Sequence, residues 1–351
     1  MRKIYVYIII LLLIILNSSC LKNIPKVEDT NFSDLTNTQK ELLIRVIATG
    51  YNRGGNKTFE ELLKYANENG YIYDDNVLEF YKYFVGEINN TTKTKSLSDD
   101  PHYNPKIKNY ILNIINDQFK NNSPNVFDNY DEIIPTNSSK KYPELNPNII
   151  TSFEKREFLV NRLYNKIKEY YNTSSTFKSW FEYFYPNENL TDIEIKKYSE
   201  YLVDVAYTYT NSNIELNRLH NTSSELYPSL IKLNHIPVEL ILAIIMQESR
   251  FFPGSFRAEI DNNNIYALSF GLTHTLIDAD FLGIASTDNT IGDGNKGERN
   301  FDLISYFYLG NNRNEETYFS DWDLVTIRGS MLYALIYLDM LYQKYITEVI
   351  K

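Results

Sequence analysis

One carboxyl group stands out in the sequence because it ends an almost wholly apolar run. Residues 238–246 are apolar apart from Glu239, Pro237 precedes them, and Glu248 follows. A helix that is apolar nearly all round is buried, so Glu248 is expected to emerge at its C-terminal end, on the edge of a core. Desolvation and the negative end of the helix dipole would both raise the pKa of Glu248, and a carboxyl group protonated near neutral pH can act as a general acid. The same residue could instead be a solvated side chain in the last turn of a core helix.

Other common catalytic and ligand-binding patterns are missing from the sequence. The four histidines are scattered without a His-Glu-x-x-His motif, which argues against a zinc site, and no Gly-x-Ser-x-Gly motif occurs. The glycines of residues 292–297 match a dinucleotide fingerprint formally, but no predicted strand precedes them, and the acidic spacing of a calcium loop is missing. A single cysteine excludes an internal disulfide and a multi-thiolate metal site. We therefore expect neither a metal nor a cofactor.

The amino-acid composition limits the kinds of molecule that the protein is expected to bind. The 351 residues include 45 acidic and 35 basic side chains, giving a formal net charge of −10, which argues against nucleic-acid binding because phosphate contacts need a basic surface. Tyrosine is abundant, with 30 residues against 19 phenylalanines and 2 tryptophans. Tyrosine suits wet, half-buried surfaces such as carbohydrate clefts, but an AT-rich genome explains the same bias.

The elements that must position Glu248 are predicted to be helices, and no alternating strand of useful length is recognised. An all-α fold is therefore expected, interrupted by a linker at residues 121–149, which carry four prolines and no periodic pattern. Capping boxes and apolar spacing predict helices that begin near Thr38 (ending at Gly50), Thr58, Thr151 and Thr191, and helices over residues 77–88 and 107–119.

The N-terminus is typical of an export signal. Two basic residues precede an apolar run over residues 4–16, which is too short to span a bilayer, and small polar residues follow as far as Cys20. This arrangement resembles a bacterial lipoprotein signal of the relaxed kind found in spirochaete-like lipoproteins, with Asn17 in place of the usual apolar residue. Residues 1–19 are then a signal peptide, and Cys20 is lipidated and anchors an exported protein to a membrane, facing the periplasm. The alternative is an ordinary signal peptide that is cut nearby.

The segment around Glu248 resembles the catalytic core of the soluble lytic transglycosylases. In that family a buried helix ends in Glu-Ser, as at Glu248 and Ser249, and a Gly-Leu-Met-Gln turn follows, as at residues 269–274. Pro253 and Ser255 are similar to a short Asn-Pro…Ser stretch of the family. Residues 325–333 look like its later helix. The resemblance covers roughly residues 213–351 and implies a lysozyme-like, mainly helical domain.

The sequence departs from the family pattern at two places. Thr273 and His274 stand where the family has Met-Gln, although a histidine can still donate a hydrogen bond to a sugar carbonyl. The family's closing Ala-Tyr-Asn motif has no clear match.

The resemblance implies cleavage of the β-1,4 bond between N-acetylmuramic acid and N-acetylglucosamine in peptidoglycan glycan strands, with a 1,6-anhydro product. Glu248 would act as general acid and then as base, Ser249 would orient it, and the turn would bring backbone close to the sugar. The substrate-binding residues implied are Ser249, Ser269, Phe270, Gly271, Leu272 and His274.

Three other readings stay open. One is a hydrolytic muramidase that uses Asp278 or Asp280 to activate water. Another is an inactive peptidoglycan-binding lipoprotein that keeps the fold, and the third is a helical surface lipoprotein with chance similarity. The expected organisation is a signal peptide (1–19), an N-terminal helical region (20–120), a linker (121–149), a second helical region (150–212) and the lysozyme-like domain (213–351).

Overall fold

The computed structural model describes the chain over residues 30–91, 145, 153–174, 178, 190–211, 213–217, 228–252, 255–261, 264–277 and 327–351. The described part is mainly helical. Its α-helices are α2 (Asn37–Arg53), α3 (Phe59–Ala66), α4 (Tyr73–Val85), α6 (Phe153–Thr173), α8 (Asp192–Asn211), α9 (Val238–Ser249) and α12 (Ile327–Ile350). Its 3₁₀ turns are η3 (Phe32–Asp34) and η6 (Leu233–His235), and its strands are β1 (Glu215–Asn217), β2 (Leu230–Lys232), β3 (Phe256–Asp261), β4 (Asn264–Phe270) and β5 (Thr275–Ile277).

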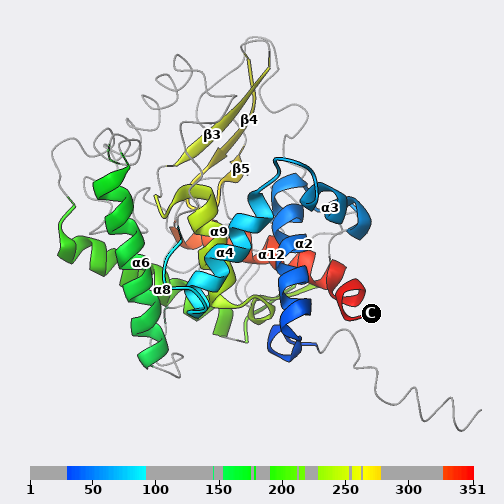
Figure 1. Ribbon diagram of the computed structural model, residues 1–351, viewed down its shortest axis with the longest axis horizontal. Helices are drawn as coiled ribbons and strands as arrows, with labels where there is room; N and C mark the ends of the chain where they lie inside the picture. Colours follow the sequence, from blue (N-terminus) through cyan, green and yellow to red (C-terminus); the bar gives the residue numbers. More distant parts are fainter. Residues whose placement is uncertain are drawn as a thin grey trace, which may run out of the picture.

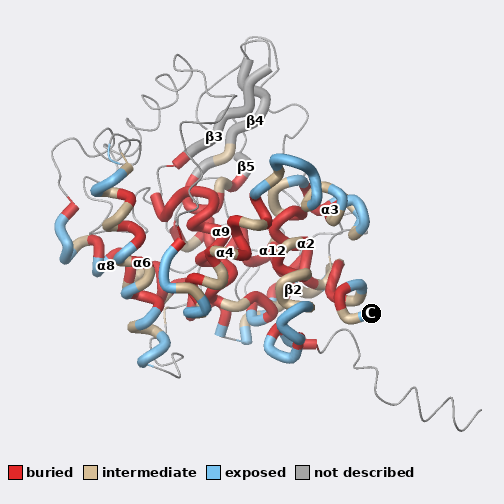
Figure 2. The backbone as a smooth tube through the Cα atoms, viewed as in Figure 1, coloured by how far each residue is buried: buried red, intermediate tan, exposed pale blue. Residues whose placement is uncertain are grey.

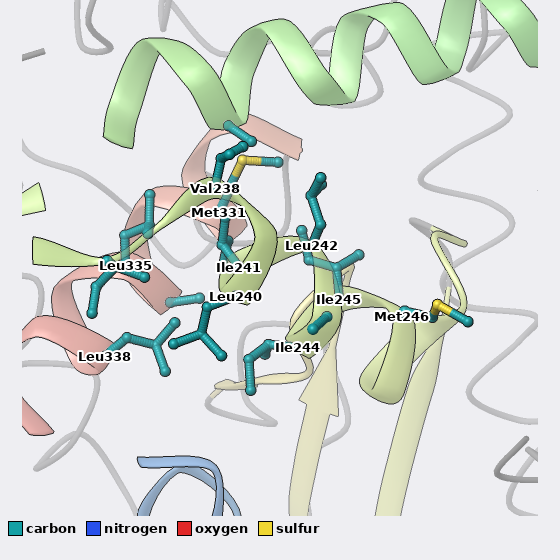
Figure 3. Close-up of a cluster of buried hydrophobic side chains, with 14 of the residues drawn as sticks. Val238, Leu240, Ile241, Leu242, Ile244, Ile245, Met246, Met331, Leu335 and Leu338 are labelled. Atoms are coloured by element: carbon teal, nitrogen blue, oxygen red, sulfur yellow. The ribbon is translucent and has the colours of Figure 1, made fainter. Parts of the chain in front are cut away.

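Helix α9 is the centre of the molecule, and it is buried along its whole length as predicted. Helix α4 packs on α9, α12 packs on α2, and both pairs meet through the contact of α2 with α4 (Figures 1 and 2). Figure 3 shows Met331, Leu335 and Leu338 of α12 beside the apolar side chains of α9. Burying a side chain of this size contributes about 1.5–3 kcal/mol, so this contact holds the N-terminal half of α9 in place.

Two of the predicted helix starts are confirmed by their capping boxes. Thr58 and Glu61 exchange side-chain-to-backbone hydrogen bonds at the start of α3, and Thr191 and Glu194 do the same at α8. The apolar stripes of the next two helices are confirmed as well, since their predicted core positions are all buried: Leu159, Leu163, Ile167 and Tyr170 in α6, and Ile195, Tyr198, Leu202, Val205 and Tyr209 in α8.

The first predicted helix was placed wrongly at both ends. Thr36, not Thr38, caps α2, because Gln39 completes its capping box, and the helix continues through Gly50 to Arg53. Gly50 serves close packing and not termination, since a Cβ there would lie 3.1 Å from Leu341 of α12. The helix ends at Gly54, whose φ of 101° suits glycine.

The strands are the main departure from the all-α expectation. β3, β4 and β5 form an antiparallel three-stranded sheet, and β1 and β2 form a separate antiparallel pair. The sequence of β3, Phe-Arg-Ala-Glu-Ile-Asp, does alternate apolar and charged residues, which is the pattern of a β-strand. β1 and β2 are each three residues long, too short to show a period.

Several predictions lie outside the described residues: the signal peptide of residues 1–19 with Cys20, the helix at residues 107–119, and the linker of residues 121–149 apart from Leu145. Within the described residues, no helix combines the length and apolarity needed to cross a bilayer. The described residues before and after position 213 share one buried core, which runs from Phe32 to Val349.

Candidate functional site

Glu248 lies at the penultimate position of α9, just before the chain leaves the helix sharply. Arg250 and Phe251 have positive φ angles of 53° and 66°, a backbone conformation that non-glycine residues adopt at an energetic cost. The hydroxyl of Tyr198 donates to the Phe251 carbonyl at 2.8 Å and holds the bend. The backbone of Glu248 is therefore held by α9 before it and by this bend after it.

The two carboxyl oxygens of Glu248 face different elements. The hydroxyl of Tyr73, the first residue of α4, donates to Oε1. Nδ1 of His274 lies 3.1 Å from Oε2, close enough for an ion pair, although the two groups are not aligned as a hydrogen bond. The Glu248 side chain is 8% exposed, so its carboxyl group is largely withdrawn from water while keeping some access to it.

The turn between β4 and β5 brings His274 to Glu248. Gly271 has a φ of 83° and His274 a φ of 48°, and the Gly271 N–H donates to the Ser255 carbonyl at 2.9 Å. Thr273 lies between them, and its hydroxyl oxygen is 2.7 Å from that of Ser330 in α12. The hydroxyl of Tyr51 in α2 donates to the Thr273 carbonyl at 2.8 Å. The turn is thus anchored by three separate segments.

The second ring nitrogen of His274 also has a partner. Nε2 lies 2.7 Å from the hydroxyl oxygen of Ser255, whose residue is fully buried. The backbone of Ser255 is fixed as well, because its N–H donates to the Phe252 carbonyl at 3.1 Å. Ser255, His274 and Glu248 therefore form a continuous series of polar groups.

Three tyrosines with raised pKa values interact electrostatically with Glu248. Burial raises the pKa of Tyr73 and of Tyr51 well above 10, and the negative charge of Glu248 adds to both shifts. Burial raises the pKa of Tyr71 to about 12, with a further contribution from Glu248. All three phenols therefore stay protonated at neutral pH, so each retains its hydroxyl proton as a hydrogen-bond donor.

The structure brings some predicted site residues together and leaves others apart. Gly271, Leu272 and His274 lie on the turn beside Glu248, and Leu272 is fully buried. Ser249 donates to the Ile245 carbonyl within its own helix at 3.2 Å, and not to the Glu248 side chain. Ser269 is half-buried in β4. The side chain of Phe270, together with Asp278 and Asp280, lies outside the described residues.

Sequence reasoning missed the contribution of the N-terminal helices. Tyr73 is 175 positions from Glu248 in the chain, and Tyr51 is 222 positions from Thr273. No local pattern could have signalled either contact, because both tyrosines lie in ordinary helical sequence.

Within the part of the chain that the structure describes, no group of three or more His, Cys, Asp or Glu side chains could hold a metal ion. No family model, curated protein or solved structure matches the chain.

Proposed function

We propose that the protein is a peptidoglycan lytic transglycosylase with Glu248 as its catalytic residue, built on a lysozyme-like arrangement of helices. One observation carries the proposal: the 8%-exposed carboxyl group of Glu248 ends a buried helix and faces the Gly271–His274 turn, with His274 Nδ1 3.1 Å from Oε2. The two segments that carry the family resemblance therefore meet at one carboxyl group.

The chemistry needs that group in two protonation states. Glu248 gives its proton to the glycosidic oxygen as the bond from C1 of the muramoyl residue breaks. The resulting carboxylate takes the proton of the muramoyl 6-hydroxyl as its oxygen closes onto C1. The product carries a 1,6-anhydro ring, no water is consumed, and the acid is restored. A single carboxyl group is sufficient, whereas ordinary glycosidases need two.

The surroundings of Glu248 support both states. Withdrawal from water removes hydration that favours the charged form, which suits the acid step. The Tyr73 hydroxyl donates to Oε1 and stabilises the carboxylate that exists between the two steps. The substrate is insoluble, so a lipid anchor at Cys20 would keep an exported, periplasm-facing enzyme beside it.

The test is digestion of purified peptidoglycan by the purified protein, with released fragments identified by mass spectrometry. Glu248→Gln is expected to lower the rate about 10²–10⁴-fold, the usual contribution of a general acid–base residue. Glu239→Gln is the matched control, because Glu239 is a buried carboxyl group at the other end of the same helix, where it pairs with Lys155 at 2.7 Å. Release of no muropeptides, or equal rates for wild type and Glu248→Gln, would overturn the proposal.

The same experiment separates the rival functions. A hydrolytic muramidase gives fragments one water heavier than the anhydro form. An inactive binding protein gives no fragments but sediments with peptidoglycan.

A further inference from the structure

Ser255, His274 and Glu248 are connected in the order found in serine hydrolases. The hydroxyl oxygen of Ser255 is 2.7 Å from Nε2 of His274, and Nδ1 of the same ring is 3.1 Å from the Glu248 carboxyl group. In a hydrolase of that kind the serine attacks the substrate and the carboxyl group is buried behind the histidine. Which residue acts on a substrate here depends on whether Ser255 or Glu248 is accessible.

Exposure decides between the two ends. Ser255 is 0% exposed, so its oxygen cannot approach a substrate carbonyl, while the Glu248 side chain is 8% exposed. The accessible end is the carboxyl group. The series therefore runs in the opposite direction to that of a serine hydrolase, with the serine at the buried end.

We propose that His274 is a positioning residue for Glu248: Ser255 holds its ring in the tautomer that carries the proton on Nδ1, and this N–H stabilises the Glu248 carboxylate between the two steps of the reaction. The inference rests on the proposed function, because it assigns His274 a part in the acid–base cycle of Glu248.

The position of the Ser255 hydroxyl suits the proposed tautomer. Its backbone N–H donates to the Phe252 carbonyl, and its own carbonyl accepts from the Gly271 N–H at 2.9 Å. The hydroxyl is thereby held against Nε2 and can donate its proton to that nitrogen. A neutral imidazole that accepts at Nε2 carries its hydrogen on Nδ1, the nitrogen that faces Glu248.

The backbone conformation of His274 limits which residues can replace it. His274 has a φ of 48°, in the left-handed region, where asparagine is tolerated better than most residues. The amide of asparagine can also place a donor near the position of Nδ1 but has no group at the position of Nε2. His274→Asn is therefore the conservative variant that keeps the donor toward Glu248 and removes the link to Ser255.

Tyrosines from other elements also face Glu248, and they do not duplicate this role. Tyr73 donates to Oε1, the other carboxyl oxygen, and Tyr51 and Tyr71 act on Glu248 through their electrostatic interaction. Removing the donor at Oε2 should therefore disfavour the carboxylate and raise the pKa of Glu248. Because the acid step needs protonated Glu248, the loss of rate at high pH should then shift to higher pH.

The experiment compares wild type, His274→Ala, His274→Asn, Ser255→Ala and the double variant Ser255→Ala/His274→Asn, all as the full chain. Muropeptide release is measured as a function of pH and of peptidoglycan concentration. In parallel, the Glu248 carboxyl resonance of ¹³C-labelled resting protein, assigned by its loss in Glu248→Gln, is titrated.

His274→Ala should lower the maximal rate about tenfold, because the carboxylate loses the electrostatic stabilisation of the nearby N–H, with the apparent KM little changed. Its alkaline limb and its carboxyl titration should both move to higher pH, whereas His274→Asn should restore part of the rate and the wild-type titration. Ser255→Ala should lower the rate in wild type but have no further effect when His274 is already Asn.

Two results would overturn the inference. One is an unchanged Glu248 carboxyl titration in His274→Ala. The other is a Ser255→Ala substitution that lowers the rate equally in wild type and in His274→Asn. If His274→Ala does not fold, the inference is tested by comparing Ser255→Ala, His274→Asn and the double variant with wild type. If wild type releases no muropeptides, the proposed function fails, but the ¹³C titration still tests whether His274 stabilises the carboxylate.

Discussion

At the scale of single residues, Tyr73 connects the N-terminal helices to the candidate acid. Its hydroxyl donates to Glu248 Oε1, and the ring is buried at the start of α4. A buried acceptor that loses its donor costs more than an average hydrogen bond, because the lost interaction is not replaced by water.

Tyr73→Phe removes that donor and nothing else. We expect it to lower the free energy of unfolding by about 1–3 kcal/mol, measured by urea unfolding, and to lower the rate of muropeptide release. Tyr83→Phe is the matched control, since Tyr83 is a buried tyrosine of the same helix whose hydroxyl donates to the Arg162 carbonyl at 3.1 Å. It should lose stability but keep its rate. A normal rate in Tyr73→Phe would show that the Tyr73 hydroxyl is not part of the chemistry.

The raised pKa of Tyr73 also predicts how stability depends on alkaline pH. The unfolded chain loses its tyrosine protons near pH 10, whereas the folded protein keeps the proton of Tyr73 because burial raises its pKa. The unfolded state then binds fewer protons, so stability falls as pH rises above about 10, by about 1.4 kcal/mol per pH unit for each such tyrosine. Urea unfolding between pH 9 and 11 should give a slope that is smaller in Tyr73→Phe than in wild type, on average by about half this amount over that range. Equal slopes would contradict the assignment.

At the scale of elements, Asp339 connects three segments near the N-terminal end of α9. Its carboxyl group accepts from the Lys232 N–H at 2.8 Å and from Gln343 Nε2 at 2.7 Å, and it lies 2.6 Å from His235 Nδ1. Asp339 is fully buried in α12. β2, η6 and α12 are thereby tied together around the start of α9.

Removing the Asp339 carboxyl group leaves the Lys232 N–H, the Gln343 amide and the His235 ring without their buried partner. Asp339→Ala should therefore lower the free energy of unfolding by about 3–5 kcal/mol, measured by chemical denaturation. Glu348→Ala in the same helix removes an acidic side chain whose pairing with Lys351 is exposed, and it should change stability by less than about 0.5 kcal/mol. Similar losses in the two variants would mean that the Asp339 cluster is not what holds these elements together.

Helices were predictable where their signals are local. The capping boxes at Thr58 and Thr191 and the apolar stripe of α8 each lie within a few turns of sequence, and each is confirmed. The end of α2 was misplaced because Gly50 is needed for packing against Leu341, which the local sequence cannot show. The sheet around the site was missed because only β3 carries an alternating pattern of useful length.

At the scale of the whole molecule, the site is assembled from both halves of the chain. The proximity of Glu248 to the Gly271–His274 turn could be predicted from sequence, because their residue types and order carry the resemblance. Tyr51 and Tyr73 could not, since they reach the site only through the packing of α2 and α4 on α12 and α9. A boundary drawn at position 213 therefore separates the acid from residues that hold it.

A fragment comprising residues 213–351 should consequently fail to form the site. Without α2 and α4, the apolar faces of α9 and α12 would be exposed to water, so we expect no cooperative unfolding transition by circular dichroism and no muropeptide release. A fragment that unfolds cooperatively and digests peptidoglycan would show that the N-terminal helices are dispensable.

In the proposed function, Glu248 cleaves peptidoglycan without consuming water. The most direct measurement is digestion of peptidoglycan in H₂¹⁸O, with mass spectrometry of the newly formed chain ends and Glu248→Gln alongside. We predict 1,6-anhydro ends without ¹⁸O from wild type, and a rate reduced at least a hundredfold in the variant. Reducing ends that carry ¹⁸O, or the same products at the same rate from Glu248→Gln, would contradict the claim.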